Sequence, residues 1–314
     1  MRRTLLPLAT VVLLAAVLIS SSFASAQQQA SSSTVPVKTV VTVLGPNFSP
    51  PPAIGKEDVA VYSGKDRQDV TSWVPAQGDN AGLQLAILID DADSPTSIGT
   101  HFDEIKNFIT SQPATTEVGI FYATSGSASA AADFSSDHAA VAKKLRLPLG
   151  RFGGASPSVY LSLQDLAAHW PANGMRHEVL MIASGIDRLH PGIDSPYVDQ
   201  AIHKVQSSGV VVHTIYVGGP FLADLPFRMS IAWQNLVRVA NDSGGQPFFQ
   251  GFETPVNFAS IFTQLDTVLK NQYLLTFVTP RSEKKKGQMR DIRIHVEQHD
   301  ARLYYPAQVF VPGP

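Results

Sequence analysis

Four short, almost uninterrupted apolar runs constrain this chain more than any other feature. They lie at 83–90, 117–124, 178–184 and 210–218 in a sequence of 314 residues. Strands buried on both faces have this composition, which is typical of a parallel sheet covered by helices on each side. The segments between the runs show helical periodicity, so strand alternates with helix. We therefore expect an α/β fold with a doubly wound, mostly parallel sheet.

Amphipathic stripes support the helices of this arrangement. The clearest apolar repeat, with 3-4-3 spacing, falls within 256–270. Another stripe is formed by Trp233, Leu236, Val237 and Ala240. Further helices are expected near 98–112, 137–145, 158–169 and 196–207.

The two ends of the chain read as β structure instead. Residues 37–80 and 271–314 carry alternating, strand-like patterns. Each segment is small for independent folding, so we expect the two to pair into one small β unit. The α/β domain at 81–270 is then inserted between them. The run of three lysines at 284–286 most simply forms a solvent-exposed hairpin turn.

The first 26 residues have the pattern of a secretory signal peptide. Arg2 and Arg3 precede an apolar stretch from Leu5 to Ile19, and Ala24-Ser25-Ala26 matches a cleavage site. The alternative is an uncleaved anchor, but the apolar run is short for a membrane span. We expect export, with cleavage near Ala26. Residues 27–36 read as a polar, flexible linker.

Composition and charge narrow the possible partners and the possible location of the protein. The formal net charge is −2, and no long basic stretch argues for nucleic acid. The chain has no cysteine, so an exported form depends on core burial rather than disulfides. That combination fits a bacterial periplasmic or secreted protein. No second apolar segment is long enough to cross a bilayer, so we expect no membrane span in the mature chain.

A group of acidic residues closes the first apolar run. The stretch "LAILIDDADSP" places Asp90, Asp91, Asp93 and Ser94 directly after the predicted strand. Ligands of doubly wound sheets bind outside the carboxyl ends of the strands. We call the loops at this end of the sheet the crest, and we take it as the candidate binding edge.

At this point the chain resembles the von Willebrand factor A domains. Those domains begin with a buried strand ending in Asp-x-Ser-x-Ser. The side chains of this motif hold a divalent metal, and an acidic group of the ligand completes the coordination of the metal. "GGASPSVYLSL" (153–163) stands at their second metal loop, and "LMIASGIDR" (180–188) at the third. With its β flanks, the chain looks like the exported A-domain-related proteins common in Acidobacteria. The resemblance implies a Rossmann-like sheet and a crest that binds a ligand.

The first two loops depart from the family pattern. Matching Asp-x-Ser-x-Ser onto the sequence keeps Asp90 and Ser94 but places Ala92 where a hydroxyl is needed. In the second loop the threonine position falls on Ala155 or, with a shift of one residue, on Ser156.

The third loop has Ser184 where the family has aspartate. Because Mg²⁺ demands near-octahedral oxygen ligation, lost ligands are not readily replaced. We expect a degenerate site whose acidic residues are solvated, and no cofactor. If Mg²⁺ or Mn²⁺ is held, the resemblance assigns it to Asp90, Ser94 and Ser156.

Two functions follow. The first is an exported, non-enzymatic module that binds a protein partner through the crest; the second is a structural or assembly scaffold of the bacterial envelope with a vestigial crest. We expect no enzyme, because neither a His-Glu-x-x-His motif nor a Gly-x-Ser-x-Gly turn after a strand is present. The candidate ligand-binding residues are Asp90, Asp91, Asp93, Ser94, Gly154, Ser156, Ser184 and Asp187.

Overall fold

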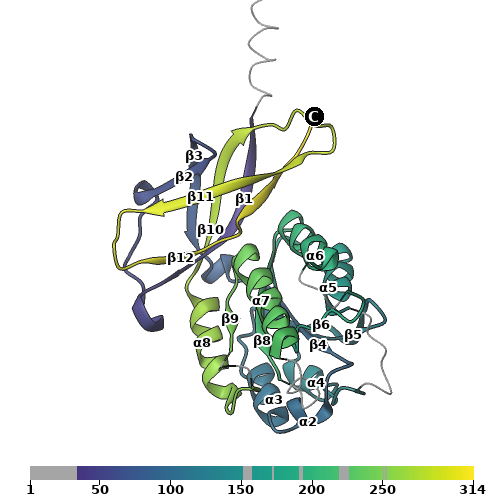
Figure 1. Cartoon of the computed structure of the whole chain (residues 1–314). Helices are drawn as coiled ribbons and strands as arrows, with labels where there is room; N and C mark the ends of the chain where they lie inside the picture. Colours follow the sequence, from purple (N-terminus) through teal and green to yellow (C-terminus); the bar gives the residue numbers. More distant parts are fainter. Residues whose placement is uncertain are drawn as a thin grey trace, which may run out of the picture.

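Two sheets organise the protein. The computed structural model describes residues 34–150, 158–171, 173–190, 194–218, 226–249, 251 and 253–314. A seven-stranded sheet lies at the top of Figure 1, and a six-stranded sheet with its helices lies below it. The signal peptide expected at 1–26 lies outside the described residues.

The six-stranded sheet has the order β6-β5-β4-β7-β8-β9. All neighbours pair in parallel except β6, which is antiparallel to β5. The mostly parallel sheet expected from the apolar runs is therefore present, with a partly exposed antiparallel strand at one edge. Its strands are β4 (Leu83–Asp90), β5 (Thr116–Thr124), β6 (Ser127–Ser135), β7 (Arg176–Ala183), β8 (Val210–Tyr216) and β9 (Pro247–Phe248).

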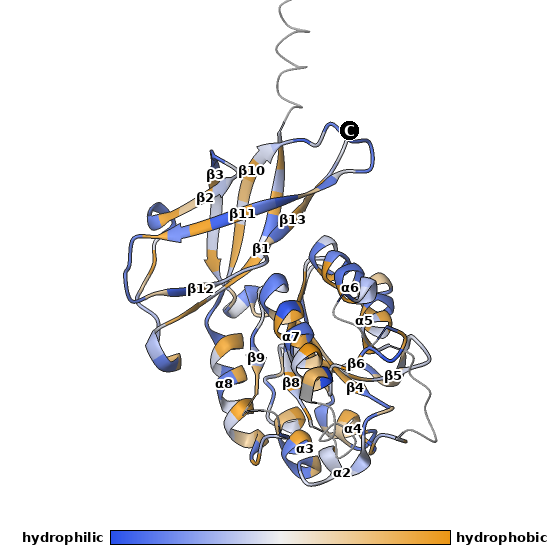
Figure 2. Ribbon diagram, viewed as in Figure 1, coloured by the Kyte–Doolittle hydropathy of each residue, from blue (hydrophilic) through white to orange (hydrophobic). Residues whose placement is uncertain are grey.

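Helices cover both faces of this sheet. They are α2 (Pro95–Gly99), α3 (Phe102–Thr110), α4 (His138–Ala142), α5 (Val159–Ala168), α6 (Pro196–Ser207), α7 (Pro226–Ser243) and α8 (Phe258–Lys270). One buried cluster joins the sheet to α3, α4 and α8, and a second joins it to α5, α6 and α7. Figure 2 shows the matching pattern, with hydrophobic strands between helices that are hydrophobic on one side.

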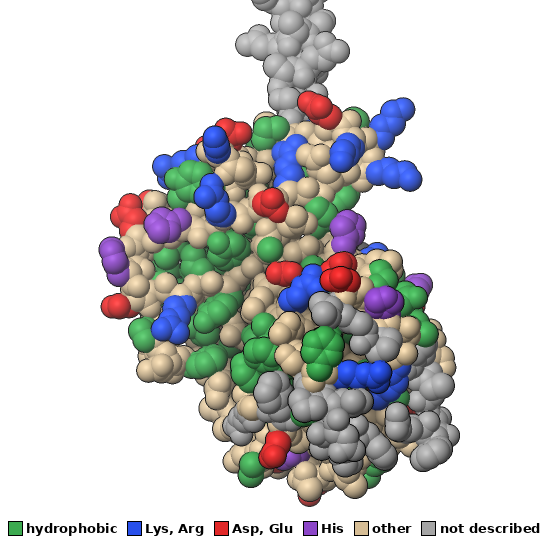
Figure 3. All heavy atoms as spheres, viewed as in Figure 1, with side chains coloured by type: hydrophobic (Ala, Val, Ile, Leu, Met, Phe, Trp, Pro, Cys, Tyr) green, Lys and Arg blue, Asp and Glu red, His purple; other side chains and the backbone are tan. Residues whose placement is uncertain are grey.

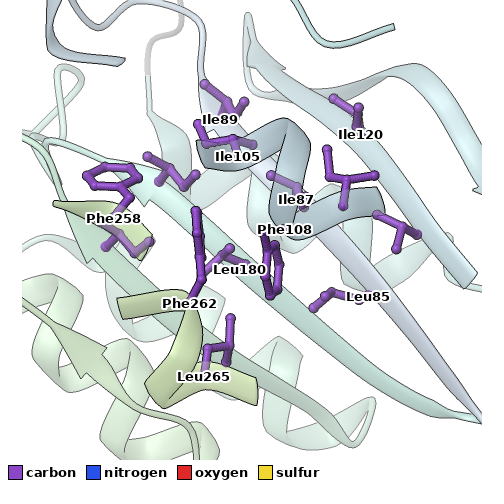
Figure 4. Close-up of a cluster of buried hydrophobic side chains, with 14 of the residues drawn as sticks. Leu85, Ile87, Ile89, Ile105, Phe108, Ile120, Leu180, Phe258, Phe262 and Leu265 are labelled. Carbon is purple, nitrogen blue, oxygen red and sulfur yellow. The ribbon is translucent and has the colours of Figure 1, made fainter. Parts of the chain in front are cut away.

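Strand β4 explains why the apolar run is continuous. All eight of its residues are buried, because successive side chains point to opposite faces and both faces are covered. Leu85, Ile87 and Ile89 belong to the first cluster, shown in Figure 4. Within that cluster Phe108 of α3 stacks on Phe262 of α8, with ring centroids 4.5 Å apart.

The single helix expected at 98–112 is two helices, α2 and α3. The chain leaves the helical path at His101, whose φ and ψ are −107° and 6°. The ring of His101 stacks on Phe258 at 4.0 Å, and its Nδ1 lies 2.7 Å from the Glu104 carboxylate. These contacts fix the N-terminus of α3 against α8, a long-range constraint that periodicity does not reveal.

The seven-stranded sheet combines both ends of the chain. Its order is β12-β1-β10-β3-β2-β11-β13, with antiparallel pairing throughout. Strand β1 begins at Thr34, inside the segment expected to be a linker, because Thr34 to Thr42 pair along β10. The strands are β1 (Thr34–Leu44), β2 (Val59–Ser63), β3 (Asp66–Pro75), β10 (Gln272–Pro280), β11 (Gln288–Val296), β12 (Arg302–Tyr304) and β13 (Gln308–Val311).

The lysine run at 284–286 is exposed, as expected, but it does not close a hairpin. Both edges of β10 are already paired, with β1 and with β3, so β11 pairs with β2 instead. Lys and Arg side chains project at the upper right of Figure 3, on the side where Figure 1 marks the end of the chain. The turn therefore connects two strands that are not neighbours.

Buried polar contacts join the two sheets at the amino end of β7. Arg176 is 7% exposed, and its guanidinium donates to the carbonyl oxygens of Ala81 at 3.1 Å and Leu269 at 3.4 Å. It also donates to the side chain of Gln272. These acceptors belong to the two chain segments that pass between the sheets, so Arg176 fastens both crossings at once.

The crest lies at the far end of the molecule from this joint. Strand β1 begins, and the chain ends, at the end of the molecule opposite α2, α3 and α4 (Figure 1). Within the described ranges, no helix is both long enough and apolar enough for a bilayer crossing.

Candidate functional site

The crest contains two separate ionic clusters, each built on a carboxylate that follows β4. Parallel strands end at the same edge of a sheet, so the loop after β4 meets the loop after β7. Asp90, Asp91 and Asp93 are 0%, 1% and 5% exposed. A solvated acidic edge was expected, and that expectation is wrong.

The first ionic cluster surrounds Arg188, which follows β7. Its Nη1 donates to Asp90 Oδ2 at 3.0 Å, and its Nη2 donates to Asp93 Oδ1 at 3.2 Å. Ser184 donates to Asp93 twice, from its backbone N–H at 2.6 Å and from its hydroxyl at 2.7 Å. The remaining Asp90 oxygen accepts from Ala92 N–H at 3.0 Å. One guanidinium therefore bridges two buried carboxylates.

The charges of this cluster are tightly linked. Burial, and then the neighbouring charge of Asp93, raise the pKa of Asp90 to about 7, although Arg188 acts in the opposite direction. Burial also raises the pKa of Asp93, against the contributions of Arg188 and Ser184. Two carboxylates compete for one guanidinium, so the pair holds a proton more readily than exposed aspartates do.

The second cluster centres on Asp91 and Arg146. Nη1 and Nη2 of Arg146 donate to the two Asp91 oxygens at 2.6 and 2.9 Å, a bidentate arrangement. Leu149 N–H donates to Asp91 at 3.0 Å, and Thr124 Oγ1 donates at 3.3 Å. The Arg146 guanidinium also lies 3.8 Å above the Tyr122 ring. Burial acts to raise the pKa of Asp91, but these donors outweigh it and the pKa is lowered.

The other predicted site residues either make local hydrogen bonds or lie outside the described residues. Asp187 accepts from Leu189 N–H at 3.1 Å and from the Ser195 hydroxyl, so it shapes its own loop. The Ser94 hydroxyl bonds Thr96 Oγ1 at 2.7 Å in an exposed position. Gly154 and Ser156 lie outside the described residues. The structure thus brings Asp90, Asp93 and Ser184 into one cluster, whereas the hydrogen bonds of Ser94 and Asp187 go to other residues.

Arg146 and Arg188 are the crest residues that the sequence analysis missed. Arg188 is the last residue of the "LMIASGIDR" stretch, four positions after Ser184. Arg146 lies one residue beyond the helix expected near 137–145. A usable signal was available, because acidic residues at the end of a fully buried strand require nearby cations.

The described donors do not fit the divalent ion that the resemblance implies. Oxygens of Asp90 and Asp93 already accept from Arg188, whose positive charge repels a second cation. Ala92 has no hydroxyl, and Ser94 is directed to Thr96. Across the described part of the chain, no cluster of three or more His, Cys, Asp or Glu side chains is arranged to hold a metal. Arg188 supplies the positive charge at this site.

Comparisons with solved structures find similar folds at low identity. An aerotolerance-related membrane protein from Bacteroides fragilis is 16% identical over 60% of this chain and 98% of its own, with a TM-score of 0.45. The conserved hypothetical protein BatB from Bacteroides thetaiotaomicron is 14% identical over 60% and 100%, with a TM-score of 0.44. The SpRpn10 VWA domain is 13% identical over 57% and 93%, with a TM-score of 0.40. No protein-family model matches, and no curated protein matches either.

Sequence identities this low bear on the fold alone. The fold is therefore described from the topology of the molecule itself. A buried first strand ends in the acidic loop, an antiparallel edge strand follows β5, and α8 closes the domain before the chain returns to β structure. The six-stranded sheet and its helices have the Rossmann-like arrangement that the resemblance to von Willebrand factor A domains implies.

Proposed function

We propose that this protein is an exported, non-enzymatic binding module that engages a protein partner through the crest without a metal bridge. The observation that carries the proposal is the Arg188 guanidinium between Asp90 and Asp93. In the metal-dependent version of this fold, an ion on these carboxylates recruits an acidic ligand group. Here the positive charge belongs to the chain, so recognition does not depend on an added ion.

The polar groups of the crest support binding rather than catalysis. Ser184 and Ser195 both donate to carboxylates, and in the described ranges no histidine ring bonds either hydroxyl. A nucleophilic serine needs a base that takes its proton and is itself oriented by a third group. Arg188 remains 28% exposed above its carboxylates, which leaves a cationic face for a partner.

A hollow beside the crest adds to this surface. It has a volume of about 520 Å³ and is lined by residues of α2, α3 and the segment before α8, including Ser97, His101, Glu104 and Thr254. Hydroxyl groups and an imidazole–carboxylate pair suit a partner with polar side chains. Export itself rests on the signal peptide predicted at residues 1–26.

The proposal is tested by capture of partners from an envelope extract, with and without EDTA. We expect equal capture under both conditions, and calorimetric titration with Mg²⁺ should give no heat above dilution. Loss of capture in EDTA would establish the metal-dependent version instead.

Variants then locate the binding edge. Arg188→Ala and Leu189→Ser should each reduce capture at least tenfold, whereas Arg238→Ala, in an exposed pair with Asp199, should not. Leu189 is 47% exposed, so its replacement leaves the fold intact and covers the case in which Arg188→Ala unfolds. Full capture by folded crest variants, with loss on altering the seven-stranded sheet, would favour the envelope scaffold.

A further inference from the structure

Exposed apolar side chains gather at the crest. The described residues expose seven large apolar side chains. Five of them follow the carboxyl ends of strands or precede helices that start there, and a sixth lies in the first turn of such a helix, α7. These six are Leu147, Leu149, Leu189, Phe227, Phe249 and Val256. The seventh, Phe310, lies on β13 of the other sheet. Such a concentration marks an interaction surface more often than chance exposure does.

One segment of this surface has a fixed backbone. We call residues 143–150 the leucine loop. Asp91 accepts from Leu149 N–H at 3.0 Å, and the Asp91 carbonyl accepts from Gly150 N–H at 2.9 Å. Arg146 adds its bidentate pair with Asp91, and its backbone N–H donates to the Tyr122 hydroxyl at 2.8 Å. The loop is thus attached to the ends of both β4 and β5.

The side chains of Leu147 and Leu149 take no part in these hydrogen bonds. Leu147 is 42% exposed and Leu149 is 53% exposed. A Cβ placed on Gly99 of α2 would lie 3.8 Å from Leu147 Cδ2, and one on Gly150 would lie 3.3 Å from Pro95 Cδ. The loop therefore lies along α2 with two leucines partly in solvent. Rigid apolar groups on a surface lower the entropic cost of binding a partner.

The charges beside the leucines are basic. Lys143 and Lys144 are exposed, and in the described part of the chain neither ammonium group pairs with a carboxylate. Arg146 keeps a 41% exposed side chain while the carboxylate that it pairs with is buried. The outward charge of the loop is therefore positive, and an acidic partner is the complementary one.

We propose that the leucine loop binds an amphipathic segment of a partner protein that carries both apolar and acidic side chains. Leu147 and Leu149 contact its apolar face, and Lys143 and Lys144 contact its carboxylates. This inference rests on the proposed function and specifies the partner class. It assigns Asp91 a structural part, because this carboxylate holds the loop and does not touch the partner.

The test uses fluorescence anisotropy with three fluorescein-labelled peptides of about 12 residues. The first has Leu and Glu in an amphipathic helical pattern, the second has Lys in place of Glu, and the third has Ser in place of Leu. We expect the first to bind the protein at least tenfold more tightly than the other two. The double variants Leu147→Ser/Leu149→Ser and Lys143→Glu/Lys144→Glu should each weaken binding at least tenfold.

Phe310→Ser is the matched control, because Phe310 is 39% exposed but lies on the other sheet. This control should bind like the wild type, and melting temperatures should show that every variant is folded. Equal binding by the leucine variant, or equal loss in the control, would overturn the proposal. Vesicles of phosphatidylglycerol and phosphatidylcholine provide the other arm. Binding to them that needs both leucines, without peptide binding, would assign the loop to a membrane surface and overturn the protein partner.

Failure here can be told apart from failure of the proposed function. If Arg188→Ala and Leu189→Ser lose capture from extract while the leucine variant keeps it, and the wild-type protein binds no peptide, the crest still binds a partner and only the present inference is wrong. If none of these folded variants loses capture, both ideas are wrong.

Discussion

The two ends of the six-stranded sheet bury similar ionic groups and use them differently. At the amino end, Glu178 is fully buried between Arg176 and His213, at 3.5 and 2.8 Å. At the carboxyl end, Asp90 and Asp93 share Arg188. The cation at the amino end is 6% exposed in its side chain, whereas Arg188 is 28% exposed. One group faces the interior of the molecule, and the other faces the solvent.

This difference shows what each arginine is for. Arg176 also donates to Ala81, Leu269 and Gln272, so its removal would leave several buried acceptors without a donor. Among the described residues, Arg188 donates beyond its carboxylates only to the Ala92 carbonyl. Buried ion pairs are a weak source of net stability, but removal of one partner alone is costly. The amino end is therefore a joint between the sheets, and the carboxyl end is a surface that tolerates more change.

The largest effect is expected at the amino end. Arg176→Met should lower the free energy of unfolding by about 3–5 kcal/mol, because it leaves Glu178 and three other acceptors buried without this donor. Urea denaturation followed by circular dichroism measures the change. Arg238→Ala, which breaks an exposed pair, is the control and should cost less than about 1 kcal/mol. A loss below about 1 kcal/mol for Arg176→Met would contradict the structural role of the joint.

The same substitution at the crest should cost less. Arg188→Met should lower the free energy of unfolding by about 3 kcal/mol, the lower end of the range for a broken buried ion pair, since water reaches the carboxylates from the exposed side once the guanidinium is gone. Denaturation in the same buffer gives a direct comparison with Arg176→Met. If the two variants lose equal stability, the crest is as integral to the fold as the joint, and the contrast between the two ends disappears.

A third change separates the two crest clusters. Asp91→Asn should remove the bidentate pair with Arg146 and cost about 1–2 kcal/mol, because a neutral amide is a weaker acceptor for a guanidinium. Hydrogen exchange should accelerate at Leu149 N–H, which donates to Asp91. Asp194→Asn, at an exposed crest position, should change neither quantity. Unchanged exchange at Leu149 would mean that Asp91 does not hold the leucine loop.

Sequence reasoning was most successful where burial alone decides the structure. Strand β4 spans Leu83–Asp90, as expected from its apolar run, because a strand covered on both faces has a distinctive composition. The end of α8 at Lys270 was also expected, since its apolar stripe stops there. These features depend on local spacing, which the sequence displays directly.

Partners across long sequence distances were not predictable in the same way. Asp91 meets Arg146, which is 55 residues away, and Asp90 meets Arg188, which is 98 residues away. Each pairing depends on the path of a loop after a strand or helix, and no periodicity describes such a path. The acidic run therefore predicted a site at the crest, but its solvation was predicted wrongly because the arginines that neutralise it lie in other loops.

The smallest expected effect on the free energy of unfolding concerns His177, at the amino end of the sheet. His177 lies beside the joint, stacked on Trp170 at 5.0 Å, and burial lowers its pKa from 6.5. The unfolded chain then binds a proton more readily, so this residue makes the free energy of unfolding fall as the pH drops below about 6.5. His177→Phe retains a ring but cannot titrate, so the variant should gain stability relative to the wild type between pH 7.5 and 5. A constant difference between the two unfolding curves across that range would show that water screens His177, and that the buried character of the joint ends at Arg176.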